Sequence, residues 1–183
     1  MEGYNIIEEL GYGCFGTVYL VEDVITKTQY AMKEIQSLTG VGGFKETKER
    51  FERRIQDEID GTKLFHKYNI GPAIYNFSIN YPTAYIIMDL FDVDLSLVLN
   101  NSLTLELREQ LMYLYSQKER YKLYHRDLSE HNIMVKFGKN RTEIKEVKFI
   151  DCAISTIVPE HEEFRKDFEI EQKRLKRIIE VLR

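Results

Sequence analysis

The change of hydrophobic pattern along the chain is the sequence feature that most constrains its fold. The first part contains short β-branched and aromatic runs separated by glycines and polar residues, which is typical of a strand meander. We expect these strands at 6–10, 17–22 and 29–35. Phe51, Ile55 and Ile59 then recur at helical spacing and predict an amphipathic helix over about 45–66.

The second part is mainly helical. Gly71-Pro72 interrupts the regular pattern. After it we expect a strand pair at 74–79 and 84–90, followed by a helix over 103–120. A hairpin at 133–137 and 144–150 and a last helix from about 162 complete the prediction. A β-rich half therefore precedes a mainly helical half, which indicates an α+β fold. With 183 residues we expect one domain over 1–183, divided into lobes at 1–89 and 90–183.

Composition excludes several classes of protein. The net charge of −4 argues against a protein that binds polyanions over its whole surface. No apolar run approaches the roughly 20 residues that a membrane-spanning helix needs, and the start lacks the layout of a secretory signal. Cys14 and Cys152 lie far apart, so neither a disulfide framework nor a zinc site is indicated. We expect an intracellular, cytoplasmic protein without membrane contact.

A glycine-rich segment, GYGCFGTV, lies between the first two predicted strands. Before a helix this spacing would indicate a dinucleotide site. Between strands, Gly11, Gly13 and Gly16 resemble the flap of protein kinases, in which missing side chains let backbone amides approach the ATP phosphates. Taken alone, the segment is equally consistent with an ordinary glycine-rich hairpin.

The segment HRDLSEHN, residues 125–132, fits the protein kinase catalytic-loop pattern HRDLxxxN at every fixed position. A capped turn would explain Asp127 or Asn132 singly but not the whole string. The resemblance implies that Asp127 accepts the hydrogen bond of an incoming hydroxyl and that Asn132 offers its carbonyl oxygen to Mg²⁺. Asp151, at the end of the run VKFID, matches the metal-binding aspartate of DFG, although Cys152 and Ala153 replace its Phe and Gly.

The kinase resemblance implies a bound Mg-ATP, or Mn-ATP, and assigns further residues to it. Lys33 of YAMK would contact the α and β phosphates, held by Glu58 of the following helix, with Glu52 as the less favoured partner. His125 would orient the catalytic loop. The adenine and ribose would be contacted by Val18, Ala31, Met88, Asp89, Phe91, Met134 and either Asp92 or Asp94.

Departures from the usual kinase pattern concern the second half. Pro159-Glu160 follows Asp151 too soon to end an ordinary activation segment, so we expect a truncated helical lobe. DLSEHN and the run from Asp151 to Phe168 resemble the Rio-type atypical kinases, which also lack that segment. This likeness implies that Asp167 braces the catalytic loop.

The resemblance implies a serine/threonine protein kinase that transfers the γ-phosphate of ATP to a protein substrate. The alternatives are a Rio-like ATPase or self-phosphorylating switch, a kinase-fold binding scaffold, and a small-molecule kinase. A regulatory protein could dock on the apolar stripe over 164–182 if that stripe is exposed. The basic residues of the same helix could contact RNA or an acidic partner, although a solvated charged face is the commoner explanation. Lineage stays open, and a viral or pathogen protein would act in the host cytoplasm.

Overall fold

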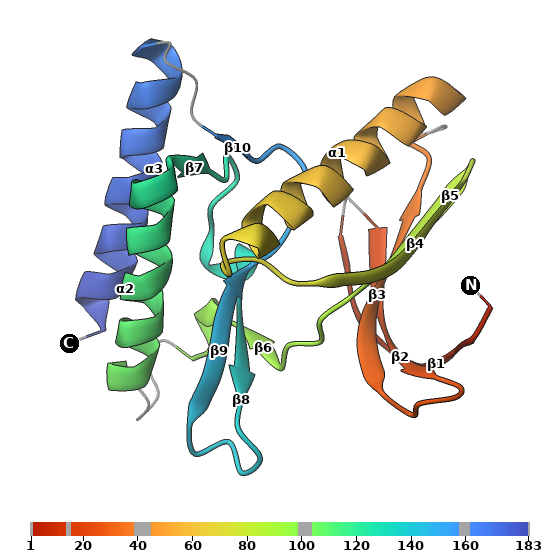
Figure 1. Cartoon of the computed structure of the whole chain (residues 1–183), viewed down its shortest axis with the longest axis horizontal. Coiled ribbons are helices and arrows are strands. Elements are labelled where there is room, and N and C mark those ends of the chain that lie inside the picture. Colours follow the sequence, from red (N-terminus) through yellow and green to blue (C-terminus); the bar gives the residue numbers. More distant parts are fainter. Residues whose placement is uncertain (1, 14–15, 39–44, 99–103, 158–161, 183) are drawn as a thin grey trace. The chain divides into compact units, whose positions relative to one another are not determined.

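The structure, a computed structural model, describes residues 2–13, 16–38, 45–98, 104–157 and 162–182 (Figure 1). Its strands alternate with three α-helices, which confirms the predicted α+β class. The helices are α1 (Lys48–Lys67), α2 (Thr104–Tyr121) and α3 (Glu162–Val181). The longer strands are β1 (Tyr4–Gly13), β2 (Gly16–Asp23), β3 (Gln29–Gln36), β4 (Ile74–Asn80), β5 (Thr83–Met88), β8 (Ile133–Phe137) and β9 (Ile144–Phe149).

The chain divides into two compact units. The first comprises Met1–Asp60 and Ala73–Leu90, and the second comprises Gly61–Pro72 and Phe91–Arg183. The predicted division placed 61–72 in the first part, whereas these residues belong to the second unit. The reason is local packing, because the Ile70 carbonyl accepts a hydrogen bond from the Phe149 N–H at 2.8 Å and the Phe65 ring packs on the Phe149 ring.

An antiparallel sheet in the order β1-β2-β3-β5-β4 forms the first unit. Side chains alternate across a strand, so the two faces of β3 have different neighbours. Met32 packs with Val21 and Ile87 on one face, while Ile35 faces α1. There it joins a buried cluster with Phe51, Ile55, Ile59, Ala84 and Ile86. Lys33 shares the α1 face with Ile35, two residues away.

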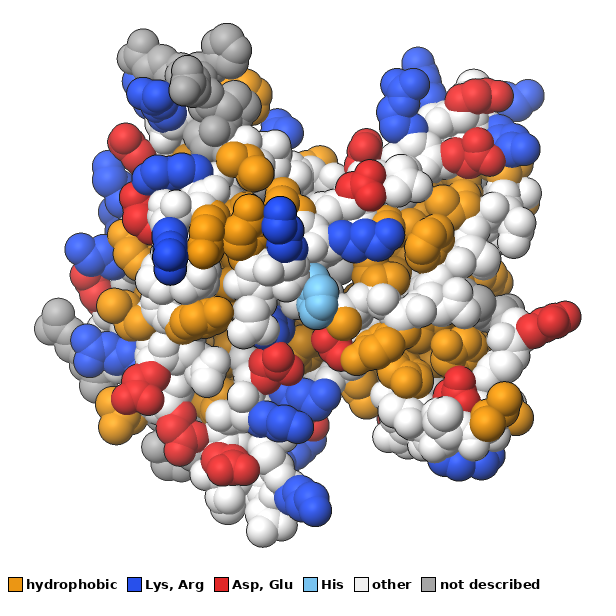
Figure 2. Space-filling view, viewed as in Figure 1, with side chains coloured by type: hydrophobic (Ala, Val, Ile, Leu, Met, Phe, Trp, Pro, Cys, Tyr) orange, Lys and Arg blue, Asp and Glu red, His pale blue; other side chains and the backbone are white. Residues whose placement is uncertain are grey.

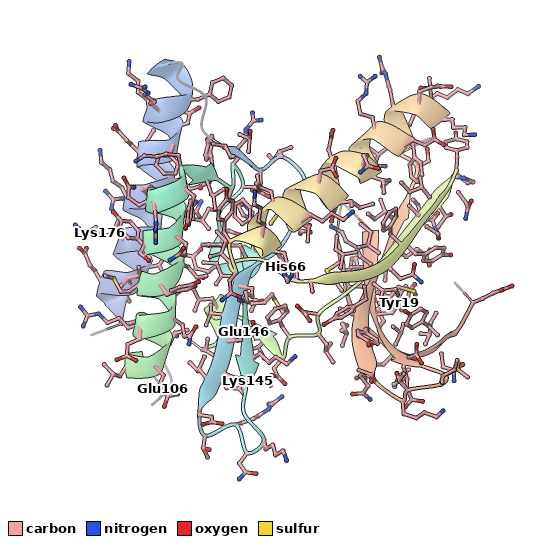
Figure 3. All side chains as sticks on the ribbon, viewed as in Figure 1. Tyr19, His66, Glu106, Lys145, Glu146 and Lys176 are labelled. Carbon is pink, nitrogen blue, oxygen red and sulfur yellow. The ribbon has the colours of Figure 1, made fainter. Side chains whose placement is uncertain are left out.

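In the second unit α2 packs against β9 of the sheet β6-β8-β9, in which β6 is Val93–Asp94, and α3 lies beside α2 (Figure 1). The core contains Leu107, Leu111 and Leu114 of α2 together with Leu175, Ile178, Ile179 and Leu182 of the α3 stripe. Phe168 of that stripe is also buried, and Phe164 is half-buried. Glu106, near the start of α2, accepts a hydrogen bond from the Ile144 N–H at 2.7 Å and so joins this helix to β9 (Figure 3). Most of the α3 stripe is buried in this core, so the condition for docking on it, an exposed stripe, is not met at these residues.

Three short strands escaped the sequence pattern because two residues carry no detectable periodicity. They are β6 (Val93–Asp94), β7 (Leu123–Tyr124) and β10 (Thr156–Ile157), with β10 antiparallel to β7. Cys14, Pro159 and Glu160 lie outside the described residues. Within the described ranges, no helix is long and apolar enough to cross a membrane.

Candidate active site

The glycine-rich segment contains the end of β1 and the start of β2, in the first unit. Gly16 has a φ of +133°, and a Cβ at this position would lie 2.1 Å from the Glu34 carbonyl oxygen, so only glycine fits. Among the described residues, a Cβ on Gly11 or Gly13 would meet no atom within 4 Å. Open space beside these two backbone positions is compatible with the close approach of a phosphate.

The acid opposite Lys33 is Glu58. The Lys33 Nζ lies 2.5 Å from the Glu58 Oε1, and both side chains are buried. Glu58 directly precedes Ile59 on the face of α1 that packs against β3, and this register brings the two side chains together. Glu52, the other candidate, is more exposed and lies 3.8 Å from Lys48, one helical turn before it.

The residues expected around adenine lie on several strands. Val18 in β2 and Ala31 in β3 are in the first unit, where Ala31 pairs in register with Met88 of β5. The Asp89 carboxylate has partners within the first unit, because it accepts hydrogen bonds from the Ala73 N–H at 2.7 Å and from the Tyr75 hydroxyl at 2.8 Å. In the second unit, Phe91 is buried and Met134 lies in β8.

Asp92 and Asp94, the two ribose candidates, both have local structural partners. The Asp92 Oδ2 accepts a hydrogen bond from the Phe137 N–H at 2.8 Å. Asp94 caps the short helix η2 (Leu95–Leu97) by accepting from the Ser96 N–H. Burial favours the neutral form of Asp94, but hydrogen bonds from Ser96 and His131 outweigh it, so the pKa of Asp94 is lowered. These local hydrogen bonds explain both carboxylates without a ligand.

Asp127 and Asn132 contact each other within the catalytic loop. The Asn132 Nδ2 donates to the Asp127 backbone oxygen at 2.8 Å and to its carboxylate Oδ2 at 3.2 Å. The short helix η3 (Glu130–Asn132) between them closes the loop, with the Asn132 N–H donating to the Ser129 carbonyl. Because the amide nitrogen is used in this way, the Asn132 Oδ1 remains as the amide atom suited to a cation.

His125 joins the catalytic loop to the segment before Asp151. Its ring is fully buried, with Nε2 2.7 Å from the Ile150 carbonyl oxygen and Nδ1 3.3 Å from the Asp127 N–H. A carbonyl only accepts and an N–H only donates, so the ring is neutral, with its proton on Nε2. Burial lowers the pKa of His125, which keeps it in this form.

Glu171 of α3 holds the same loop from the other side. Its Oε1 accepts a hydrogen bond from the His125 N–H at 3.0 Å, and its Oε2 accepts from the Arg126 N–H at 2.8 Å. The fully buried Lys118 of α2 forms an ion pair with Glu171. Asp167 was expected to brace the loop, and that expectation is wrong, because the bonding acid lies one helical turn further along α3.

A sequence signal for this pair was present and was missed. Leu107, Leu111 and Leu114 define the apolar stripe of α2, and Lys118 occupies its next position. Glu171 occupies the equivalent interior position between Phe168 and Leu175 on α3. Opposite charges on two apolar stripes indicate a buried ion pair, since a lone buried charge would be too costly.

Asp151 and Arg126 both have left-handed backbone conformations, with φ of 56° and 71°. Residues other than glycine rarely adopt this backbone conformation, so surrounding contacts must stabilise it at both positions. For Arg126 the contact is Glu171. On the Asp151 side, the Ile150 N–H donates to the Asn132 carbonyl at 3.0 Å, which ties the end of β9 to the catalytic loop.

The donor set fits a magnesium ion that is shared with a nucleotide. Within the described ranges no group of three or more His, Cys, Asp or Glu side chains is placed to hold a metal. Asn132 and Asp151 supply hard oxygen atoms instead. Mg²⁺ is usually bound through one or two protein oxygens, together with waters and substrate phosphates, so two protein ligands suffice.

A glycine-rich strand turn, a buried lysine–glutamate pair and an aspartate–asparagine loop together define the kinase class of phosphotransferase. The comparisons with known proteins agree. The family model "Protein kinase domain" matches residues 4–172. A probable serine/threonine-protein kinase, YbdM of Bacillus subtilis (strain 168), is 27% identical over 143 residues, which cover 74% of this chain and 54% of that relative. The chain thus spans about half the length of this relative. It belongs to the protein kinase family.

Proposed function

We propose that the chain is a serine/threonine protein kinase that transfers the γ-phosphate of ATP, bound with Mg²⁺ or Mn²⁺, to a hydroxyl of a protein substrate. The observation that carries the proposal is the Asp127–Asn132 contact inside a loop that His125 and Glu171 fix from two sides. A scaffold that only binds partners would have no need for this arrangement. The relative's description as a probable serine/threonine kinase supports the choice of hydroxyl.

Each residue has a distinct chemical part in this proposal. ATP supplies the phosphoryl group. Asp127 accepts a hydrogen bond from the substrate hydroxyl and orients it for in-line attack, while Asn132 and Asp151 hold the cation that neutralises the phosphate charge. Lys33, kept extended by Glu58, binds the α and β phosphates. Catalysis then comes chiefly from positioning and charge neutralisation.

Calorimetric titration of the protein with ATP tests the cation site. We expect tight binding with Mg²⁺ or Mn²⁺ and much weaker binding with a chelator, because Asn132 and Asp151 need a cation between themselves and the phosphates. Asp151→Asn should reduce this metal dependence. Equal ATP affinity with metal and with chelator would reject the assigned ligands.

A second candidate function is a Rio-like ATPase or self-phosphorylating switch. It is favoured by the segment that follows Asp151, which is held close to the loop rather than extended toward a substrate. There Thr156 pairs with Tyr124, and the Ser155 hydroxyl donates to the His125 carbonyl at 3.2 Å. Radiolabelled ATP distinguishes the two functions. A protein kinase transfers label to an added Ser/Thr peptide library, whereas the switch releases phosphate or labels itself.

A further inference from the structure

A groove of about 830 Å³ lies in the second unit, between the end of α2, α3 and β10. Its lining includes four aromatic or apolar residues, Tyr115, Tyr121, Ile157 and Phe168. None of the residues to which we assign a part in phosphate transfer lines it. Pockets of about 300–1,000 Å³ are the size that encloses a small ligand or a few residues of a peptide.

The groove is basic although the whole chain carries a net charge of −4. Two acids line it, Glu119 and Glu169, and Lys122 neutralises Glu119 at 2.8 Å. Five cations line the groove: Arg120, Lys122, Arg165, Lys173 and Lys176. Across the described residues no ion pair involves Arg165, Lys173 or Lys176, so their charge is available to a ligand.

The figures show the same surface. Lys and Arg side chains gather over α2 and α3 with apolar side chains between them (Figure 2), and Lys176 projects from α3 away from the core (Figure 3). A ligand that matches this surface combines negative charge with an apolar group.

We propose that this groove binds an acidic peptide segment of a partner protein, with an apolar side chain against the aromatic lining and carboxylates beside Arg165, Lys173 and Lys176. An acidic peptide combines negative charge and an apolar side chain in one chain. A nucleic acid fits less well, because its continuous phosphate backbone would pass Glu169. The inference goes beyond the phosphotransfer function and does not depend on it.

Fluorescence anisotropy with defined probes tests the proposal. The probes are a short labelled peptide in which Glu and Asp flank two leucines, the same peptide with serines for the leucines, the same peptide with lysines for the acids, and an oligouridylate. We expect only the acidic leucine peptide to bind well, with affinity that falls as salt rises. A stronger response to oligouridylate, or no binding of the acidic leucine peptide, would overturn the proposal.

Matched charge reversals locate the site. Lys173→Glu/Lys176→Glu should weaken peptide binding by about tenfold or more, because two attractive contacts become repulsive. Lys139→Glu/Lys145→Glu makes the same charge change on exposed residues of the β8–β9 hairpin. This variant should change the peptide affinity by less than about twofold. Circular dichroism confirms that both variants fold. Equal losses of peptide affinity in the two variants would show that binding depends on general electrostatic attraction, and would contradict the assigned groove.

Discussion

Glu171 accepts a hydrogen bond from the backbone N–H of Arg126 at 2.8 Å, one residue before the proposed catalytic Asp127. The same carboxylate bonds the His125 N–H and pairs with the buried Lys118. The positions of the catalytic loop and of the α2–α3 core are therefore coupled through one side chain.

The first prediction concerns this coupling. Glu171→Gln leaves Lys118 buried without its counter-charge, so we expect a loss of about 3 kcal/mol in the free energy of unfolding, measured with urea. Asp167→Asn, one turn earlier on α3, should change it by less than about 0.5 kcal/mol. Lys118→Met/Glu171→Gln should regain part of the loss, because no unpaired charge is left. Similar losses for Glu171→Gln and Asp167→Asn would contradict the assignment.

A second prediction concerns Gly61 of α1. A Cβ at this position would lie 1.8 Å from the carbonyl oxygen of Cys152, the residue after Asp151. A glycine-to-alanine change in an exposed helix raises the free energy of unfolding by about 1 kcal/mol. We expect Gly61→Ala to lower the stability instead and to weaken ATP binding, because the backbone next to Asp151 must move. Thermal unfolding and calorimetry measure the two effects.

Gly138→Ala is the matched control for this change. The three atoms nearest to the added Cβ all belong to the flexible side chain of Glu143, which can rotate away. Stabilisation by Gly61→Ala, or a larger effect at Gly138, would contradict the close backbone approach.

The third prediction is a pH dependence of stability. The pKa of His125 is lowered by burial, so below about 6.5 the unfolded chain binds a proton that the folded chain does not. The His125 contribution to stability is therefore present above that pH and is lost as the pH falls. We expect His125→Asn to reduce the slope of the unfolding free energy between about pH 7 and 5. An unchanged slope in His125→Asn would count against a neutral buried ring.

Much of the fold could be predicted from the sequence because its long elements carry clear periodicity. The α1 stripe Phe51–Ile55–Ile59 predicted the helix, and the kinase resemblance implied that its Glu58 meets Lys33. The brace of the catalytic loop could not be predicted in the same way. The family likeness pointed to Asp167, whereas the actual residue depends on which turn of α3 reaches the loop, and tertiary packing decides that.

The fourth prediction is that activity does not need phosphorylation of the segment after Asp151. The Ser155 hydroxyl donates to the His125 carbonyl, and β10 pairs with β7, so this segment is already ordered against the catalytic loop. We expect phosphatase treatment and Ser155→Ala to leave turnover within about twofold, whereas Ser155→Glu should lower it by placing a charge on the loop. A large loss of turnover after dephosphorylation, traced to Ser155 or Thr156, would show that the segment is a phosphorylation switch.

The fifth prediction separates the roles of Lys33 and Asp127. Lys33→Ala should weaken ATP binding, because it removes a phosphate contact and leaves Glu58 buried without the lysine. Asp127→Ala should leave ATP affinity largely intact, since the carboxylate is assigned to the hydroxyl. Asp57→Ala, which removes an exposed carboxylate from α1, is the control and should change neither quantity.

The most direct test of the proposed kinase activity is the rate of ³²P transfer from labelled Mg-ATP to a Ser/Thr peptide library by the wild type and Asp127→Ala. The account predicts transfer by the wild type and a turnover at least about 100-fold lower in Asp127→Ala at saturating ATP, the loss expected when a positioned acid–base group is removed. Wild-type turnover in Asp127→Ala, or no transfer by the wild type under any metal condition, would contradict it.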